Sequence, residues 1–173
     1  MKTTLEFSGL DELMDTLNRL PENVVSKRGG PVKLALKKGA KLIRDAEVER
    51  LQALLNEQGN NDTTGLLIKN VIASRGKKPA NSRGERYVVR IKRRMYPAKA
   101  NQKERVSTIK TAQIFEYGSE HQPARSFIRT AFLAKAEEAI SVIRDDLTSR
   151  IQKLVRKYGL CLLYTSPSPR DAT

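Results

Sequence analysis

Apolar residues recur at spacings of three and four along three stretches of this chain, a period that predicts amphipathic helices. The first stretch, residues 9–20, ends before Pro21 and carries one narrow stripe made of Leu10, Leu13, Met14, Leu17 and Leu20. The second runs from Pro31, which suits the first helical position, to about Gln58. Its buried face is expected to contain Leu36, Ala40, Ile43, Leu51 and Leu54.

The third and longest helical pattern begins near Ser126 and continues to about Tyr158. Its apolar seam steps by four or three residues through Ala136, Ile140, Ile143, Leu147, Ile151, Leu154 and Tyr158. At about 1.5 Å per residue, such a helix would be roughly 50 Å long. A domain of this size does not need that length internally, so we expect the helix either to bend or to contact another subunit with its far end. Core packing alone would also explain the stripe.

Between these helices the hydrophobic period changes from that of a helix to that of a strand. From Val89 to Lys92 apolar and basic residues alternate, and the segment 87–92 is rich in β-branched residues, which predicts a strand. Residues 70–75 are the expected partner strand, and the Gly- and Pro-containing segment 76–84 is the expected hairpin loop.

Shorter elements flank this hairpin. Thr63 or Thr64 is expected to cap a short helix or turn at 66–71, whose apolar members would attach it to the core. Residues 95–107, with few large apolar groups, predict a second loop. A three-residue apolar spacing resumes at 109–115 and predicts a short helix.

Together these patterns predict an α+β fold, in which a small, mainly antiparallel sheet packs with two long helices and one or two short ones. Residues 1–159 have a usual length for a single domain. Residues 160–173 differ in composition, and 161–171 resemble a translated sequencing adaptor, so we treat this segment as a non-native tail. A flexible natural tail is the alternative, because the Ser-Pro repeat at 166–169 has no need to order.

The charge of the chain is strongly basic and unevenly placed. The 173 residues include 33 Lys and Arg against 19 Asp and Glu, a formal net charge of +14. From Arg75 to Lys110 there are 13 basic residues and two acidic ones, so most of the excess lies there. The only cysteine, Cys161, falls in the tail, which removes disulfide and thiolate chemistry from the domain. No apolar run is long enough for a signal peptide or a membrane span, so we expect a soluble protein with no membrane contact.

The residues that usually carry catalysis do not form a recognisable set. His121, the single histidine, lies near Glu116 and Glu120, and a Glu–His pair is able to act as a general base. However, no nucleophile or set of oxyanion donors accompanies it, and a metal site would need further His or Cys ligands. Neither glycine-rich phosphate-binding motif occurs. We therefore expect no enzymatic activity, no metal and no cofactor, and interpret His121 as a solvated loop residue.

The basic block is the best candidate for contact with a partner or a polyanion. The residues expected to make this contact are Lys77, Lys78, Arg83, Arg86, Arg90, Lys92, Arg93 and Arg94. Because Tyr87 and Tyr96 lie among them and aromatic rings stack on bases, a nucleic-acid-binding module at 75–110 is the alternative function. No motif of a known nucleic-acid-binding fold accompanies the block. A solvated strand face and docking onto an acidic protein surface both rank above sequence-specific recognition of nucleic acid.

The most distinctive stretch is a corner at residues 114–132, with the sequence IFEYGSEHQPARSFIRTAF. It joins an aromatic–acidic–glycine turn to the entry of the last helix, and Arg125 and Arg129 are expected on one side of that helix. This arrangement suits the aiming of a helix and offers no catalytic group, which favours assembly over chemistry.

The corner resembles the Glu–aromatic–Gly–Thr … Pro–Phe–x–Arg–Pro–Ala signature of the gene-product-ten-like minor tail components of lambdoid and related long-tailed phages. These are often described as head–tail joining, tail-completion or neck proteins. The segment GLDELMDTLNRLP, the pattern TTGLLIKNV with Thr64, Gly65 and Leu67, and the terminal amphipathic helix are also similar to that family. The chain departs from the signature at the positions of Ser119, Ser126 and Thr130. The last two stand where the family often has proline, so we expect a less rigid helix entry.

This resemblance implies a structural protein of the virion neck, made in the host cytoplasm, rather than an enzyme. It implies a homo-oligomeric ring that links the capsid connector to the tail, next to head-completion and tail-terminator proteins, with non-specific contact to DNA an additional expectation. The signature positions Glu116, Tyr117, Gly118, Phe127 and Arg129 would then hold the corner. In this interpretation Phe127 is a buried anchor, Gly118 adopts an unusual φ, and Arg129 pairs with Glu116.

Overall fold

The computed structural model describes residues 30–57, 65–77, 85–97 and 106–158. Within these ranges it contains four helices and one two-stranded antiparallel sheet, which confirms the predicted α+β class. The elements are the long helices α3 (Pro31–Glu57) and α6 (Ile128–Tyr158), the short helices α4 (Leu66–Lys69) and α5 (Thr108–Tyr117), and the strands β1 (Val71–Arg75) and β2 (Tyr87–Ile91). The predicted helix at 9–20 lies outside the described residues.

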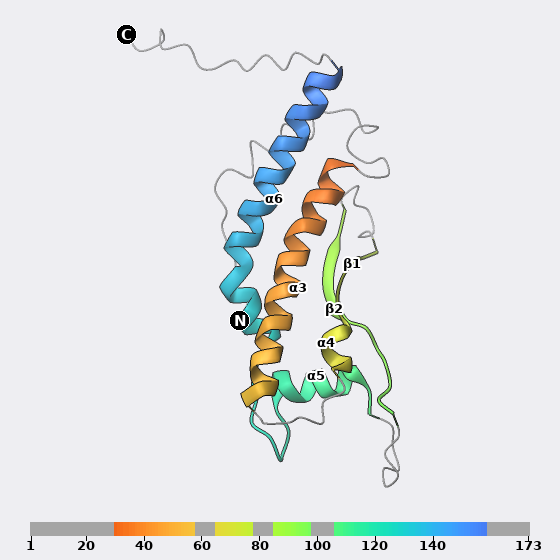
Figure 1. Cartoon of the computed structure of the whole chain (residues 1–173), viewed down its shortest axis with the longest axis vertical. Coiled ribbons are helices and arrows are strands. Elements are labelled where there is room, and N and C mark those ends of the chain that lie inside the picture. The colour runs from red at the N-terminus through yellow and green to blue at the C-terminus, as the bar shows by residue number, and fades with distance from the viewer. Residues whose placement is uncertain (1–29, 58–64, 78–84, 98–105, 159–173) are drawn as a thin grey trace, which may run out of the picture.

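Helix α3 is the central element of the molecule. Helix α6 packs along one side of it and runs in the opposite direction, and the β1–β2 hairpin lies along the other side (Figure 1). Helices α4 and α5 gather at the end where α3 finishes. The last turns of α6 extend past the beginning of α3. The expected contact of this end with another subunit stays a prediction.

The hairpin has the alternation that its sequence predicts. Its register pairs Val71 with Ile91 and Ile72 with Arg90, in an antiparallel arrangement. Val71, Val89 and Ile91 share one face and pack into the core beneath α3, whereas Arg90 is exposed on the other face. This pairing confirms the prediction of two paired strands. The apolar and basic residues alternate because successive side chains of a strand point to opposite faces.

The predicted buried face of α3 is confirmed at Ile43, Leu51 and Leu54, but it is displaced in the first half of the helix. Leu36 and Ala40 are only half-buried there, and Ala35 and Gly39 are buried instead. The displacement arises because α3 is covered on two sides, and its contact with α6 uses small residues. A Cβ atom built on Gly39 would overlap the side chain of Ile143, so glycine permits the close approach of the two helices.

The seam of α6 follows the prediction only in part. Ala136, Leu147 and Ile151 are buried, but Ile140, Ile143 and Leu154 are half-buried. Two alanines that the predicted seam omitted, Ala131 and Ala139, are buried as well. Small side chains therefore supply much of the contact between the long helices.

The larger hydrophobic cluster lies where α3, the hairpin and the short helices meet. Its buried members are Leu51, Leu54, Leu55, Leu67, Val71, Ala112, Phe115 and Phe127. A smaller cluster of Ala35, Leu147 and Ile151 joins the beginning of α3 to the second half of α6. The corner is consequently attached to the larger cluster, at the end of the molecule where α6 begins.

The structure corrects one local prediction, the cap of α4, and adds backbone pairing to a second, the loop at 95–107. The residue that precedes α4 as its N-cap is Gly65, with a φ of 61° and no side-chain cap, whereas Thr63 and Thr64 lie outside the described residues. The predicted loop at 95–107 is paired at both ends, because Met95 bridges Ser107 and the Tyr96 amide donates to the Val106 carbonyl at 3.0 Å. Backbone pairing of this kind leaves no trace in hydrophobic periodicity.

Candidate functional site

The corner begins with a sharp turn that only glycine fits. Gly118 ends α5 with φ 82° and ψ −179°, a conformation that side chains strongly disfavour. A Cβ atom at this position would lie 2.8 Å from the Ala124 nitrogen. The Arg125 amide then donates to the Phe115 carbonyl at 2.8 Å, which brings the chain back against α5. The expectation of an unusual φ at Gly118 agrees with this geometry.

The side chain of Glu116, near the end of α5, caps the beginning of α6. Its carboxylate accepts hydrogen bonds from the backbone amides of Phe127, Ile128 and Arg129, at 3.0, 2.9 and 3.2 Å. The first amides of a helix have no acceptor within the helix, and they form the positive end of its dipole. A buried carboxylate accepts their hydrogen bonds and its negative charge interacts favourably with the dipole. Glu116 therefore fixes where α6 starts and how it leaves the corner.

The predicted pairing of Arg129 with Glu116 is a minor part of this arrangement. The Arg129 Nε atom lies 3.9 Å from the carboxylate, and its side chain is 64% exposed. Its backbone amide makes the closer contact. Tyr117 is exposed, so it does not hold the corner as the resemblance implied. Phe127 has no exposed surface and lies in the core cluster, as expected of an anchor.

Two hydroxyl groups stabilise the helix entry at the positions where prolines were expected. Ser126 Oγ donates to Glu116 at 2.6 Å, and Thr130 Oγ1 donates to the Ser126 carbonyl at 2.8 Å. Proline has no side-chain donor, so neither bond would exist with proline at those positions. Side-chain hydrogen bonds therefore hold the segment in place of prolines, and the expected lower rigidity of the entry stays a prediction.

The ionisation of Glu116 reflects these contacts. Burial by itself would raise the pKa of this carboxyl group, but hydrogen bonds from Ser126 and from three backbone amides together hold its pKa below the ordinary value. The charged carboxylate is thus the favoured form at the helix start. The resemblance singled out Glu116 and its pairing with Arg129, but not the contacts of Glu116 with Ser126, Phe127 and Ile128, which lie 10–12 positions later.

A second buried carboxyl group, Glu47 in the middle of α3, was missed by sequence reasoning. It is 4% exposed, and within the described ranges no hydrogen bond or ion pair satisfies it. Burial, and secondarily repulsion from Glu116, raises the pKa of Glu47 to about 7. No sequence signal distinguishes Glu47 from the nearby Glu49. The helical pattern alone does not show which residues of α3 are covered when α6 packs on one side and the hairpin on the other.

Replacing Glu47 by glutamine is expected to stabilise the protein more at pH 8 than at pH 4.5. A raised pKa means that the folded protein holds this proton more tightly than the unfolded chain. Stability is therefore lost as pH rises from about 4.5 to about 7 and is constant above that range. At pH 8 the substitution should therefore raise the free energy of unfolding by up to about 3 kcal/mol. Urea unfolding at both pH values would measure it.

The exposed Glu49→Gln variant is the matched control for this measurement, since it removes the same charge two residues away. Its pH profile should follow that of the wild type. Identical profiles for Glu47→Gln and the wild type would show that the buried carboxyl does not titrate in this range.

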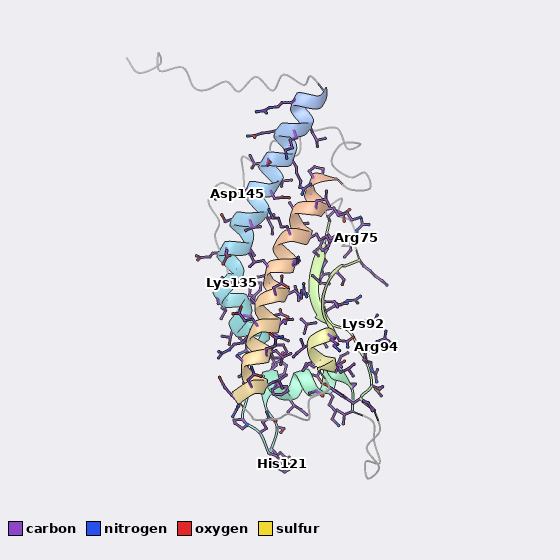
Figure 2. All side chains as sticks on the ribbon, viewed as in Figure 1. Arg75, Lys92, Arg94, His121, Lys135 and Asp145 are labelled. Carbon is purple, nitrogen blue, oxygen red and sulfur yellow. The ribbon has the colours of Figure 1, made fainter. Side chains whose placement is uncertain are left out.

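The basic block forms an exposed surface on the hairpin and on the segment that follows it. Lys77, Arg86, Arg90, Lys92, Arg93 and Arg94 are all exposed, and Lys78 and Arg83 lie outside the described residues. We call Lys92–Arg94 the cationic tract. Figure 2 shows Lys92 and Arg94 on the hairpin side of α3, away from Lys135 and Asp145 on α6. The cationic tract therefore lies on the hairpin side of the molecule.

The backbone of the cationic tract is held by Thr108, the first residue of α5. This residue is fully buried, and its hydroxyl accepts from the Arg94 amide at 3.0 Å and donates to the Lys92 carbonyl at 2.8 Å. The Thr108 amide donates to the Arg94 carbonyl at 2.9 Å, and the Lys92 amide donates to Asn70 at 2.8 Å. The three cations are thus presented by a fixed backbone. Sequence reasoning missed Thr108, because a single threonine at a loop–helix boundary gives no distinctive pattern.

The cations of this surface have few acidic neighbours. Arg75 is neutralised by Glu85, to which it donates two hydrogen bonds, and this bond raises the pKa of Arg75. Among the described residues, no ion pair involves Lys92, Arg93 or Arg94. An exposed, unpaired and positioned cluster of this kind is able to bind phosphate groups or an acidic protein surface.

The remaining candidates are His121 and groups of side chains that could hold a metal ion. His121 is exposed at the tip of the corner loop, away from the body of the molecule (Figure 2). Over the described ranges, no three His, Cys, Asp or Glu side chains are arranged to hold a metal ion. Neither long helix contains an apolar window able to cross a bilayer, as far as the described residues were searched.

Comparisons of the chain with protein-family models, with curated proteins and with solved structures found no match. The site must therefore be interpreted from its own geometry. That geometry is a capped corner that aims a long helix, and a rigid cationic tract on the opposite side of the central helix.

Proposed function

We propose that this chain is a structural protein of the head–tail junction of a long-tailed phage. In this proposal it assembles as a homo-oligomeric ring between the capsid connector and the tail. The observation that carries the proposal is the corner, where the buried carboxylate of Glu116 makes all four of its hydrogen bonds to the entry of α6. The residues that resemble the neck-protein signature thus perform an architectural task, as a virion component requires.

The distribution of exposed groups also supports a ring. A ring built by head-to-tail contacts needs two different surfaces on each subunit, one for each neighbour. Apolar side chains are exposed at the beginning of α6, where Phe132 is 46% and Leu133 is 61% exposed. The cationic tract lies on the other side of α3. These two surfaces are suited to different neighbours in an assembly.

The proposal is tested by native mass spectrometry of the full chain, alone and with connector-bearing capsids. We expect ring-sized oligomers or capsid-bound protein. The triple variant K92A/R93A/R94A should associate more slowly and with a weaker salt dependence, because such charges mainly steer association. The control K37A/R50A/K153A removes the same charge from exposed positions elsewhere. A wild-type chain that stays monomeric and binds neither capsids nor tails would contradict the proposal.

A nucleic-acid-binding module is the second candidate, and it is favoured by the three cations of the tract, which have no ion pair within the described residues. The same variants distinguish the two functions by fluorescence anisotropy with a short DNA duplex over a range of salt concentrations. Phosphate binding by the tract predicts a log–log salt slope that falls by about 2.7 in the triple variant, because each lost phosphate contact removes about 0.9. Weak binding with the same slope in both triple variants leaves the neck function as the explanation of the tract.

A further inference from the structure

A groove runs along the line where α3 and α6 meet. Its volume is about 430 Å³, and its floor consists of the half-buried apolar side chains of Leu42, Ala46 and Val142. Within the described part of the chain, no element covers these three side chains. An apolar floor between two helices is suited to a third helix, because the apolar stripe of an amphipathic helix packs into the groove between the side chains of the other two.

We propose that residues 9–20 of the same chain occupy this groove as an amphipathic helix. Their apolar stripe, Leu10, Leu13, Met14, Leu17 and Leu20, supplies the side chains that such a floor requires. The occupant is thus a segment of this chain, and the polar face of the segment remains in contact with solvent.

The dimensions of groove and segment agree. The residues of α3 that line the groove extend from Lys38 to Glu49, which corresponds to about 17 Å along a helix axis. Twelve residues, 9–20, form a helix of about 18 Å. The connection, residues 21–29, spans up to about 30 Å when extended. From the start of α3 to Leu42 is only about 17 Å, so the segment reaches the groove without exchange between subunits.

The rim of the groove has mixed charge, because Asp45 and Glu49 lie there beside its lysines. Three lysines, Lys38, Lys41 and Lys135, line the groove. Lys38 and Lys135 already have acidic partners in α6, but among the described residues Lys41 has none. The polar face of the segment contains three acids and one base: Asp11, Glu12, Asp15 and Arg19. Lys41 therefore gains an acidic partner when the segment binds, whereas a basic occupant would leave it unpaired.

Cysteine crosslinking tests the proposal on the full chain. In a Cys161→Ser background, Leu17→Cys is combined with Ala46→Cys on the groove floor and treated with a short bismaleimide. The control combines Leu17→Cys with Lys37→Cys, an exposed position of α3 outside the groove. We expect an intramolecular product for the groove pair, in an amount several-fold above that of the control, when the products are resolved by denaturing mass spectrometry.

Each other outcome would overturn the proposal. Crosslinked dimers would show that the groove receives the segment of a second copy. Equal crosslinking of the groove and control pairs would show that residues 9–20 do not occupy this site. If the Ala46→Cys variant fails to fold, as judged by circular dichroism, Val142→Cys on the facing helix replaces it. Because no assembly partner takes part in the measurement, its result does not depend on the neck function.

Discussion

Replacing Phe127 by alanine is expected to lower the free energy of unfolding by about 3–5 kcal/mol. Phe127 has no exposed surface, and it packs in the cluster that joins α3, α4, α5 and the hairpin. Its removal would leave a cavity at the point where α6 begins. Since small domains are stable by only about 5–15 kcal/mol, urea unfolding should show a clearly lower midpoint.

Phe132→Ala is the matched control for this prediction. Phe132 lies five residues later in the same helix and is 46% exposed. Loss of the same group there should change stability by less than about 1 kcal/mol, because a solvated ring leaves no cavity. If Phe127→Ala and Phe132→Ala lowered stability equally, the role of Phe127 as a core anchor would be wrong.

Replacing Glu116 by alanine is expected to cost about 2–4 kcal/mol, the second largest effect. The substitution leaves the amides of Phe127, Ile128 and Arg129 without their acceptor at the start of α6. Loss of a cap costs about 0.5–2 kcal/mol, and the one buried donor among the three, the Phe127 amide, adds about 1–3 kcal/mol when it is left unpaired. Relief of the repulsion with Glu47 offsets part of this loss. Chemical unfolding at neutral pH would measure the difference.

Glu116→Gln and Glu120→Ala complete this test. Glutamine keeps an acceptor oxygen but not the charge, so Glu116→Gln should lose less stability than Glu116→Ala. Glu120 is exposed, so Glu120→Ala should change stability little.

The pKa of Glu116 is lowered, so its contribution to stability is present above the unfolded pKa near 4.5 and is lost as pH falls through the folded pKa. Glu116→Gln should remove that acid-side loss. A stability unchanged in Glu116→Ala would be incompatible with the capping role.

The two acidic groups of this region act in opposite directions with pH. Glu116 stabilises the fold when charged, and Glu47 stabilises it when protonated. The two groups also repel each other, and Glu116 contacts the start of α6 directly, so their ionisation acts on this part of the fold. The position of α6 in turn defines the groove and the relative placement of the two surfaces assigned to neighbours.

Much of the local structure could be predicted from sequence periodicity. The alternation at Val89–Lys92 predicted a strand, the Gly- and Pro-containing segment predicted its turn, and the antiparallel pairing with residues 71–75 followed. The start of α3 at Pro31 was also predicted, and the family resemblance implied the unusual φ of Gly118. These features depend on residues near one another in the chain, and so on the conformational preferences of individual residue types.

The site depended more on tertiary structure. The sequence identified Glu116 and Phe127 as members of a corner, but not that a carboxylate at the end of α5 would cap α6. Nothing in the sequence pattern singled out Thr108, which holds the cationic tract although the tract lies 14–16 residues earlier in the chain. Hydrogen bonds between distant segments have no period in the sequence, so no pattern of spacing reveals them.

By itself, the sequence determined the class of the fold, the extents of its long helices and hairpin, and the position of its basic charge. Each follows from hydrophobic periodicity, turn residues or composition, which are local properties of the chain. Only the tertiary structure decided that Glu47 is buried, that Gly39 lies against Ile143, and that a groove with an apolar floor lies between α3 and α6. The physical reason is that burial depends on which elements cover a helix and from how many sides.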